Sequence, residues 1–185
     1  MYMQNLKLSA GFTLIETLIV VSFMGIMAMI GLPALNSSLE DARLRGAVDE
    51  VVTALEYAQL TAMTSGLKTR VSVSPTMDTI YVRRYKTPAD LFTGGGELTA
   101  SSVESETWEY MQYPLKKGVD YVINLGNEDR FQGVDITTSD FHLLNPVYFE
   151  APGTPSHGGS ATLAFGGSQM VVTMDSLTGK VSVTE

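Results

Sequence analysis

One carboxylate, that of Glu16, stands inside a long apolar run. Residues 12–35 are 24 positions, and Glu16 is the only charged residue among them. A carboxylate in hydrocarbon costs about 2.5 to 3.5 kcal/mol, so it needs a partner. The small pair Ala10-Gly11 comes directly before the run. A peptidase that cuts after Gly11 would leave a cationic amino group on Phe12. This amine, from the same chain or from a neighbouring one, is the partner that we predict for Glu16.

The two histidines, His142 and His157, are the candidates for acid-base chemistry. His157 lies in the segment TPSHGGS, where a nearby serine suggests a nucleophile system. No G-x-S-x-G elbow surrounds it, however. We therefore expect a solvated loop histidine, no catalytic residue and no enzyme. The chain has no cysteine, which excludes thiolate nucleophiles and cysteine-based metal sites.

The segment NLGNEDRFQGVD, residues 124–135, is rich in side-chain oxygen atoms. Calcium needs several carboxylate and carbonyl ligands, but this segment lacks the alternating acidic pattern of an EF-hand loop. We expect a solvated loop there, and we expect neither a metal ion nor a cofactor in the protein.

The basic residues form two small clusters, YVRRYK at residues 81–86 and the pair Lys116-Lys117. The whole chain has 12 Lys and Arg residues against 20 Asp and Glu residues, a formal net charge of -8. Nucleic acid and anionic lipid surfaces need a basic footprint. We therefore expect the clusters to be charges on a solvated strand, and we do not expect nucleic acid as a partner.

A helix must position Glu16. An apolar run of 18 or more residues is typical of a transmembrane helix, and residues 12–35 form such a run. Lys7 is the only charged residue before it, which predicts a cytoplasmic N-terminus and an outward-facing remainder. Pro33 should bend or locally melt the helix because it lacks a backbone N–H group.

The helical periodicity continues over residues 36–66 with one apolar face. Its members recur at spacings of three and four: Leu44, Ala47, Val48, Val51, Val52, Leu55, Ala58 and Ala62. Gly66 is a natural left-handed cap, which predicts a helix end near Ser65.

From residue 67 to residue 185 the apolar residues alternate, which predicts short antiparallel strands. We expect strands at 68–74, 79–85, 107–113, 118–124, 145–150, 161–165, 169–175 and 180–184. The last two should form a hairpin with its turn between Asp175 and Gly179. Residues 87–105 and 126–139 are expected to be surface loops.

The stretch GFTLIE, residues 11–16, resembles the processing motif of type IV prepilins and pseudopilins. The resemblance implies that a prepilin peptidase cuts between Gly11 and Phe12 and that Phe12 is then N-methylated. It implies that Glu16 sets the axial register of an incoming subunit. It also places Pro33 at the family's helix-kinking proline.

Residues 54–74 resemble the GspH/FimT class of minor pilins and pseudopilins. So do VYFEAPGTP, ATLAF and MVVTMDSLTGKVSV near the C-terminus, which include the Thr178-Gly179-Lys180 hairpin. The resemblance implies an α+β pilin fold. A leader of residues 1–11 would be removed, residues 12–35 would form a transmembrane or filament-core helix, and residues 36–66 its amphipathic continuation. Residues 67–185 would form an antiparallel β-sheet head on which the helix packs.

The implied function is that of a minor pilin or pseudopilin, a structural and assembly subunit of a type IV pilus or a type II secretion pseudopilus. Expected partners are the prepilin peptidase, other pilin or pseudopilin subunits, the assembly platform with its ATPase, and the membrane before assembly. The expected location is the cytoplasmic (inner) membrane, spanned once with the head outside, and then the filament. The alternatives are a DNA-uptake minor pilin of a transformation pilus, a major pilin and, least favoured, a membrane-tethered hydrolase.

Overall fold

The computed structural model describes residues 13–86 and 108–185, with only the backbone for residues 30–37. Two compact units make up the chain, Met1–Leu39 and Glu40–Glu185. The described part of the first unit is helical from Leu14 onward. The second unit contains the rest of this helix and all the strands. Residues 40–65 therefore belong with the sheets.

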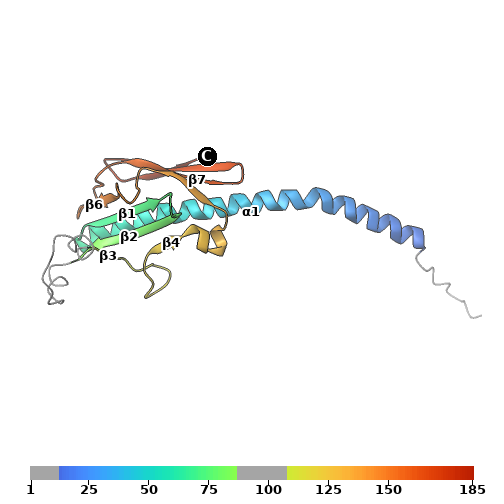
Figure 1. The fold of residues 1–185 in the computed structure, drawn as a ribbon, viewed down its shortest axis with the longest axis horizontal. Coiled ribbons are helices and arrows are strands. Elements are labelled where there is room, and N and C mark those ends of the chain that lie inside the picture. The colour runs from blue at the N-terminus through green and yellow to red at the C-terminus, as the bar shows by residue number, and fades with distance from the viewer. Residues whose placement is uncertain (1–12, 87–107) are drawn as a thin grey trace, which may run out of the picture. The chain divides into compact units, whose positions relative to one another are not determined.

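Helix α1 spans Leu14–Ser65 (Figure 1). The prediction for Pro33 was a bend or local melting, and the backbone is not melted there, since it stays helical through Pro33. The helix ends where the sequence predicts, because Gly66 adopts a left-handed φ of 69°. Its N–H group donates to the carbonyl of Ala62 at 3.1 Å. One of the last unpaired carbonyls of the helix is thereby satisfied.

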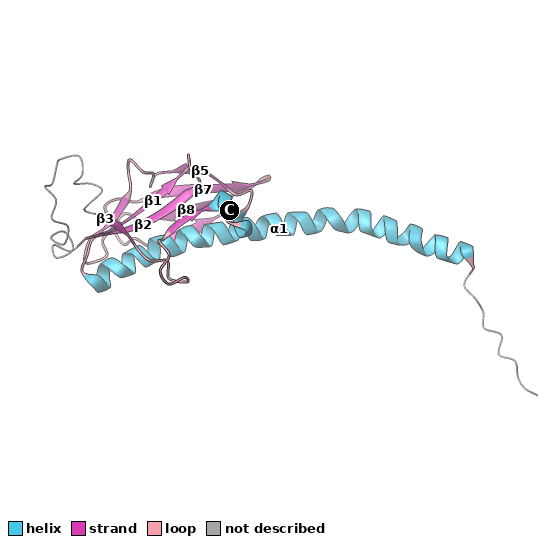
Figure 2. Cartoon of the chain, turned by 60° about the horizontal axis from the view of Figure 1, so that its bottom comes forward, coloured by secondary structure: helices cyan, strands magenta, loops and turns pink. Residues whose placement is uncertain are grey.

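The part of α1 that belongs to the second unit buries one face against the strands (Figure 2). The predicted apolar face is confirmed, with Val52 partly buried at its border. Its fully or nearly fully buried members are Leu44, Ala47, Val48, Val51, Ala54, Leu55, Ala58 and Ala62. Half of these are alanines, so strand side chains can approach the helix backbone closely. Thr69 does so, and its hydroxyl donates to the carbonyl of Ala58 at 2.9 Å.

The first sheet is antiparallel and has the strand order β3-β2-β1-β6, with β4 also paired to β2. Its strands are β1 (Thr69–Ser74), β2 (Thr79–Tyr85), β3 (Trp108–Tyr110), β4 (Val122–Asn124) and β6 (Val147–Phe149). Val71 lies opposite Val82, and Val73 lies opposite Ile80. These four side chains are buried in the same core as the helix face.

The second sheet is also antiparallel, with the order β5-β7-β8-β9. Its strands are β5 (Asp135–Ser139), β7 (Gly159–Phe165), β8 (Ser168–Met174) and β9 (Val181–Thr184). The predicted closing hairpin is β8-β9. Its turn is closed by a hydrogen bond of 3.0 Å from the Gly179 N–H to the Asp175 carbonyl.

Two loop predictions have different outcomes. Residues 87–105 lie outside the described residues. The prediction of a surface loop at residues 126–139 is wrong, because this region holds the 3-10 helix η2 (Asp129–Phe131) and strand β5, directly after η1 (Leu125–Asn127). The side chains of Leu125, Phe131 and Ile136 are buried, so the segment packs into the core. A register shift between Ile136 and Thr138 interrupts the alternation by which a strand is recognised in a sequence.

Candidate functional site

Glu16 lies in the first turn of α1. Thr13 precedes the helix, and its hydroxyl oxygen accepts a hydrogen bond of 3.4 Å from the Glu16 N–H group. A carboxylate in a first turn is favoured by the helix dipole. Gly11 and Phe12, between which cleavage is predicted, lie outside the described residues. The helix begins at Leu14, three positions after Gly11.

The side chains of residues 13–29 are all exposed. Most are large and apolar, and the exposed fraction reaches 82% at Leu14 and 81% at Met29. An apolar surface of this extent is typical of a region that binds another apolar surface. Within the described residues, no helix is apolar over a length sufficient to cross a membrane. The transmembrane helix at residues 12–35 and the role of Pro33 stay predictions.

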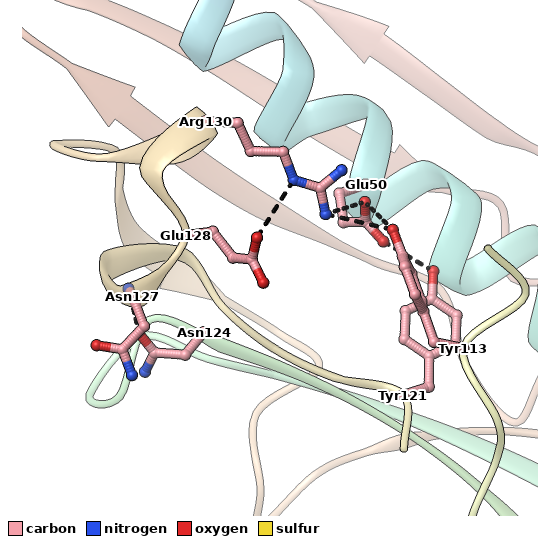
Figure 3. A network of polar contacts seen from close by, with 7 residues as sticks. All are labelled: Glu50, Tyr113, Tyr121, Asn124, Asn127, Glu128 and Arg130. Atoms are coloured by element: carbon pink, nitrogen blue, oxygen red, sulfur yellow. Dashed lines mark hydrogen bonds and ion pairs between the residues drawn. The ribbon is translucent and has the colours of Figure 1, made fainter. Parts of the chain in front are cut away.

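A second site of interest is the carboxylate of Glu50, on the part of α1 that packs against the sheets. Only 8% of this residue is exposed. Its two oxygens accept hydrogen bonds of 3.1 Å from the hydroxyl groups of Tyr113 and Tyr121 (Figure 3). Arg130 Nη2 lies 3.6 Å from Glu50 Oε2 and also donates to the Tyr113 hydroxyl at 3.3 Å. Glu128 pairs with the same guanidinium group at 3.6 Å.

The electrostatics of this cluster favour a neutral tyrosine next to a charged carboxylate. Burial raises the pKa of Tyr121 far above its ordinary value, and the adjacent Glu50 charge raises it further. The hydrogen bond with Tyr113 raises the pKa of Arg130. Arg130 therefore stays cationic and offsets the buried negative charge. The network ties α1 to the β3-β4 connection and to η2, which is a structural role.

Glu50 is not among the site residues that the sequence predicts. The residue is charged, but it stands three positions after Ala47 and four before Ala54, both of which are fully buried. Helical spacing thus places it beside the apolar face. A charged residue beside an apolar face is the sequence signal that could have indicated a buried carboxylate. The partners themselves are not indicated, because the two tyrosines lie more than 60 residues away in the sequence.

The two histidines lie in separate connections, His142 between β5 and β6 and His157 between β6 and β7. His142 Nδ1 accepts a hydrogen bond of 3.2 Å from the Leu144 N–H group. His157 Nδ1 lies 2.9 Å from Ser156 Oγ, and its ring packs near Phe141. Neither histidine pairs with a carboxylate within the described residues. The serine-histidine contact therefore lacks the acid that would orient a catalytic imidazole.

The other sequence candidates are distributed over the second unit. Residues 124–135 do not form an open oxygen-rich loop, and the described residues contain no cluster that would hold a metal ion. In the basic segment of β2, Arg83 and Arg84 point to opposite faces of the strand. Arg84 pairs with Glu109, whereas Arg83 stacks on Tyr110 with its Cζ atom 4.5 Å from the ring centre.

An N-terminal helix that packs on antiparallel sheets through its C-terminal part is the α+β arrangement of a pilin fold, as predicted. In a search of solved structures, the chain is similar to the minor pseudopilin EpsH from the type 2 secretion system of Vibrio cholerae. The TM-score is 0.51 at 14% sequence identity, over 77% of this chain and 96% of that one. The type IV minor pilin FimU of Pseudomonas aeruginosa gives 0.45 at 13% identity, over 77% and 88%. No family model matches the sequence. No curated protein matches it.

Proposed function

We propose that this protein is a minor pilin or pseudopilin, a subunit that is built into a type IV pilus or a type II secretion pseudopilus. The observation that carries the proposal is the GFTLIE motif, residues 11–16, whose last three residues begin helix α1. A new amine on Phe12 would then stand four positions before Glu16 in the sequence. In a filament, Glu16 would accept the amine of a neighbouring subunit.

Two further observations support this function. The fold is similar to that of a minor pseudopilin over most of both chains. The apolar side chains of residues 13–29 are exposed on all sides of the helix, as a helix needs if lipid surrounds it first and other helices surround it later. The prepilin peptidase, the assembly platform and its ATPase enter the proposal as the machinery that such a subunit requires.

The first test is the intact mass of the protein from native membranes, with and without an active prepilin peptidase. We expect the loss of residues 1–11 and the gain of one methyl group on Phe12. A chain that stays uncleaved in the presence of the active peptidase would contradict the proposal. The protein would then be a single-pass anchor with a pilin-like head.

The second test separates processing from assembly. Glu16→Ala should be cleaved as the wild type is, but should be lost from purified filaments because the incoming amine has no acceptor. Glu40→Ala is the matched control, since it removes a carboxylate from the same helix, and it should be incorporated normally. Normal incorporation of Glu16→Ala would contradict the register role.

A further inference from the structure

Two arginines and four aromatic residues form a surface on the first sheet, which we call the arginine–aromatic face. It consists of Arg70, Tyr81, Arg83, Trp108, Tyr110 and Tyr148. Tyr110, Arg83, Arg70 and Tyr148 are successive register partners across β3, β2, β1 and β6, so they form one row. Val71 and Val82, their neighbours along β1 and β2, are buried in the core with α1. The row therefore lies on the face of the sheet that points away from α1.

The two arginines stand directly opposite each other in an antiparallel pair. Like charges in this position repel, unless an anion lies between or above them. Neither arginine forms an ion pair with a described residue. Arg70 is only 9% exposed, and its guanidinium group makes no hydrogen bond to a described residue. The Nε atoms of both arginines are buried and have no hydrogen-bond partner among residues 13–86 and 108–185.

Aromatic rings hold both guanidinium groups in place. The Cζ atom of Arg70 lies 4.7 Å from the centre of the Trp108 ring. The Cζ atom of Arg83 lies 4.5 Å from the centre of the Tyr110 ring and 5.6 Å from that of the Tyr81 ring, and Arg83 donates to the Tyr110 hydroxyl at 2.6 Å. A guanidinium group that lies over a ring keeps the donors at its edge for a carboxylate, and since both Nε atoms are buried these donors are the Nη groups. Because the side chains are already ordered, a ligand would bind with a small loss of entropy.

Two neighbouring cations of the same sheet region, unlike Arg70 and Arg83, form ion pairs with carboxylates of the described residues. Arg84 pairs with Glu109, and Lys68 pairs with Glu150 at 2.6 Å. In a chain of net charge -8, carboxylates are abundant, yet the stacked arginines pair with none of the described ones. The face also holds the chain's only tryptophan. Tryptophan, tyrosine and arginine are the residues that carry most of the binding energy in protein interfaces.

We propose that the arginine–aromatic face binds an acidic segment of another protein subunit, whose carboxylates accept hydrogen bonds from Arg70 and Arg83. The segment would lie over Trp108 and Tyr110. The identity of the partner as a neighbouring filament subunit rests on the proposed function. Two adjacent cations suit a pair of carboxylates on a peptide. A long phosphate polymer would also meet the negative remainder of the protein, which repels it.

Trp108 provides a direct reporter for this binding, because no other tryptophan contributes to the fluorescence. The full chain in neutral detergent would be titrated with a synthetic peptide of alternating glutamate and serine. The same peptide with glutamine in place of glutamate is the uncharged control. We expect a saturable change of Trp108 fluorescence with the glutamate peptide, weakened by added salt, and no such change with the glutamine peptide.

The decisive variant is Arg70→Gln/Arg83→Gln, for which we expect an affinity lower by at least about tenfold, since two charge-assisted interactions are lost. Lys116→Gln/Lys117→Gln removes the same charge from the only other basic cluster and should bind as the wild type does. Circular dichroism checks that each variant is folded. If the glutamine variant does not fold, Arg70→Lys/Arg83→Lys keeps the charge but removes the planar fork, and it should also bind more weakly.

Three results would overturn the proposal. One is an equal response to the glutamine peptide, and another is an unchanged affinity in the folded arginine variants. The third is tighter binding of a single-stranded oligonucleotide or of anionic vesicles through the same arginines, which would assign the face to phosphate. In cells, the arginine variant should be cleaved normally but depleted from filaments. A wild-type chain that is never cleaved would contradict the proposed function. The peptide titration would still test whether the arginine–aromatic face binds an acidic segment.

Discussion

The same helix, α1, presents two different surfaces along its length. In residues 13–29 every side chain is exposed, and the apolar ones surround the helix. In residues 44–62 the apolar side chains other than Leu60 form one stripe, and this stripe is buried against strands of the same chain. The second segment buries its apolar face against the sheets of the same chain. The first segment is apolar without an intramolecular partner among the described residues, so its stability depends on what surrounds it.

The largest contrast should appear when one leucine or isoleucine is truncated in each segment. Leu55→Ala removes a fully buried side chain and should lower the free energy of unfolding by about 2 to 5 kcal/mol. Ile19→Ala, at an exposed position, should change it by less than about 0.5 kcal/mol. Chemical denaturation of the full chain in detergent, followed by Trp108 fluorescence, measures both. Similar losses in the two variants would contradict the division of the helix.

Two glutamates of α1, Glu16 and Glu50, sharpen the comparison. Glu50→Ala leaves two tyrosine hydroxyls and Arg130 without their acceptor and should cost about 2 to 4 kcal/mol. Glu16→Ala should leave the unfolding of the second unit unchanged, because Glu16 is an exposed residue of the first unit. The same denaturation assay compares them. A Glu50→Ala variant as stable as the wild type would show that the network contributes no net stability.

High pH should weaken the second unit through Tyr121. Its pKa is raised above the ordinary 10.0, so the folded state holds this proton more tightly than the unfolded state does. The resulting stability is complete below about pH 10 and is lost as the pH rises above that value. Unfolding curves at several pH values should therefore show a shallower decline for Tyr121→Phe than for the wild type. Parallel declines would mean that other groups cause the effect.

The smallest effect is expected at the exposed β8-β9 turn. Asp175 accepts hydrogen bonds from the N–H groups of Leu177 and Thr178 and from the Thr178 hydroxyl. These bonds lower the pKa of Asp175 below its ordinary value. Their contribution to the stability of the turn is therefore present at neutral pH, and it is lost as the pH falls below the ordinary pKa of an aspartate. Asp175→Ala should speed amide exchange at Gly179 without changing global unfolding. Unchanged exchange would contradict this local role.

Much of the fold followed from periodicity. The amphipathic face of α1 and the β8-β9 hairpin have regular spacing and a standard turn, and both were predicted. Strand β5 was missed because a bulge breaks its alternation, and the burial of Leu125 and Phe131 was hidden in a polar segment. The hydrophobic pattern reports local geometry, and these elements are defined by contacts with distant parts of the chain.

The candidate sites divide in the same way. Glu16 was found because a charge in an apolar run is a local anomaly. Glu50 was not, since its partners are distant in sequence. The opposition of Arg70 and Arg83 is likewise a matter of strand register, which no single segment reveals.

One further consequence concerns Gln59, whose Nε2 group donates to the carbonyls of Gly153 and Thr178 at 2.9 Å each. A side chain on Gly179, which has a left-handed φ of 70°, would meet this amide at 2.5 Å. The glutamine and the glycine are thus sterically interdependent. Because the left-handed φ strains any side chain at position 179 whatever stands at position 59, relatives that keep this hairpin should keep the glycine. Gly179→Ala should therefore strain the turn and displace the Gln59 amide.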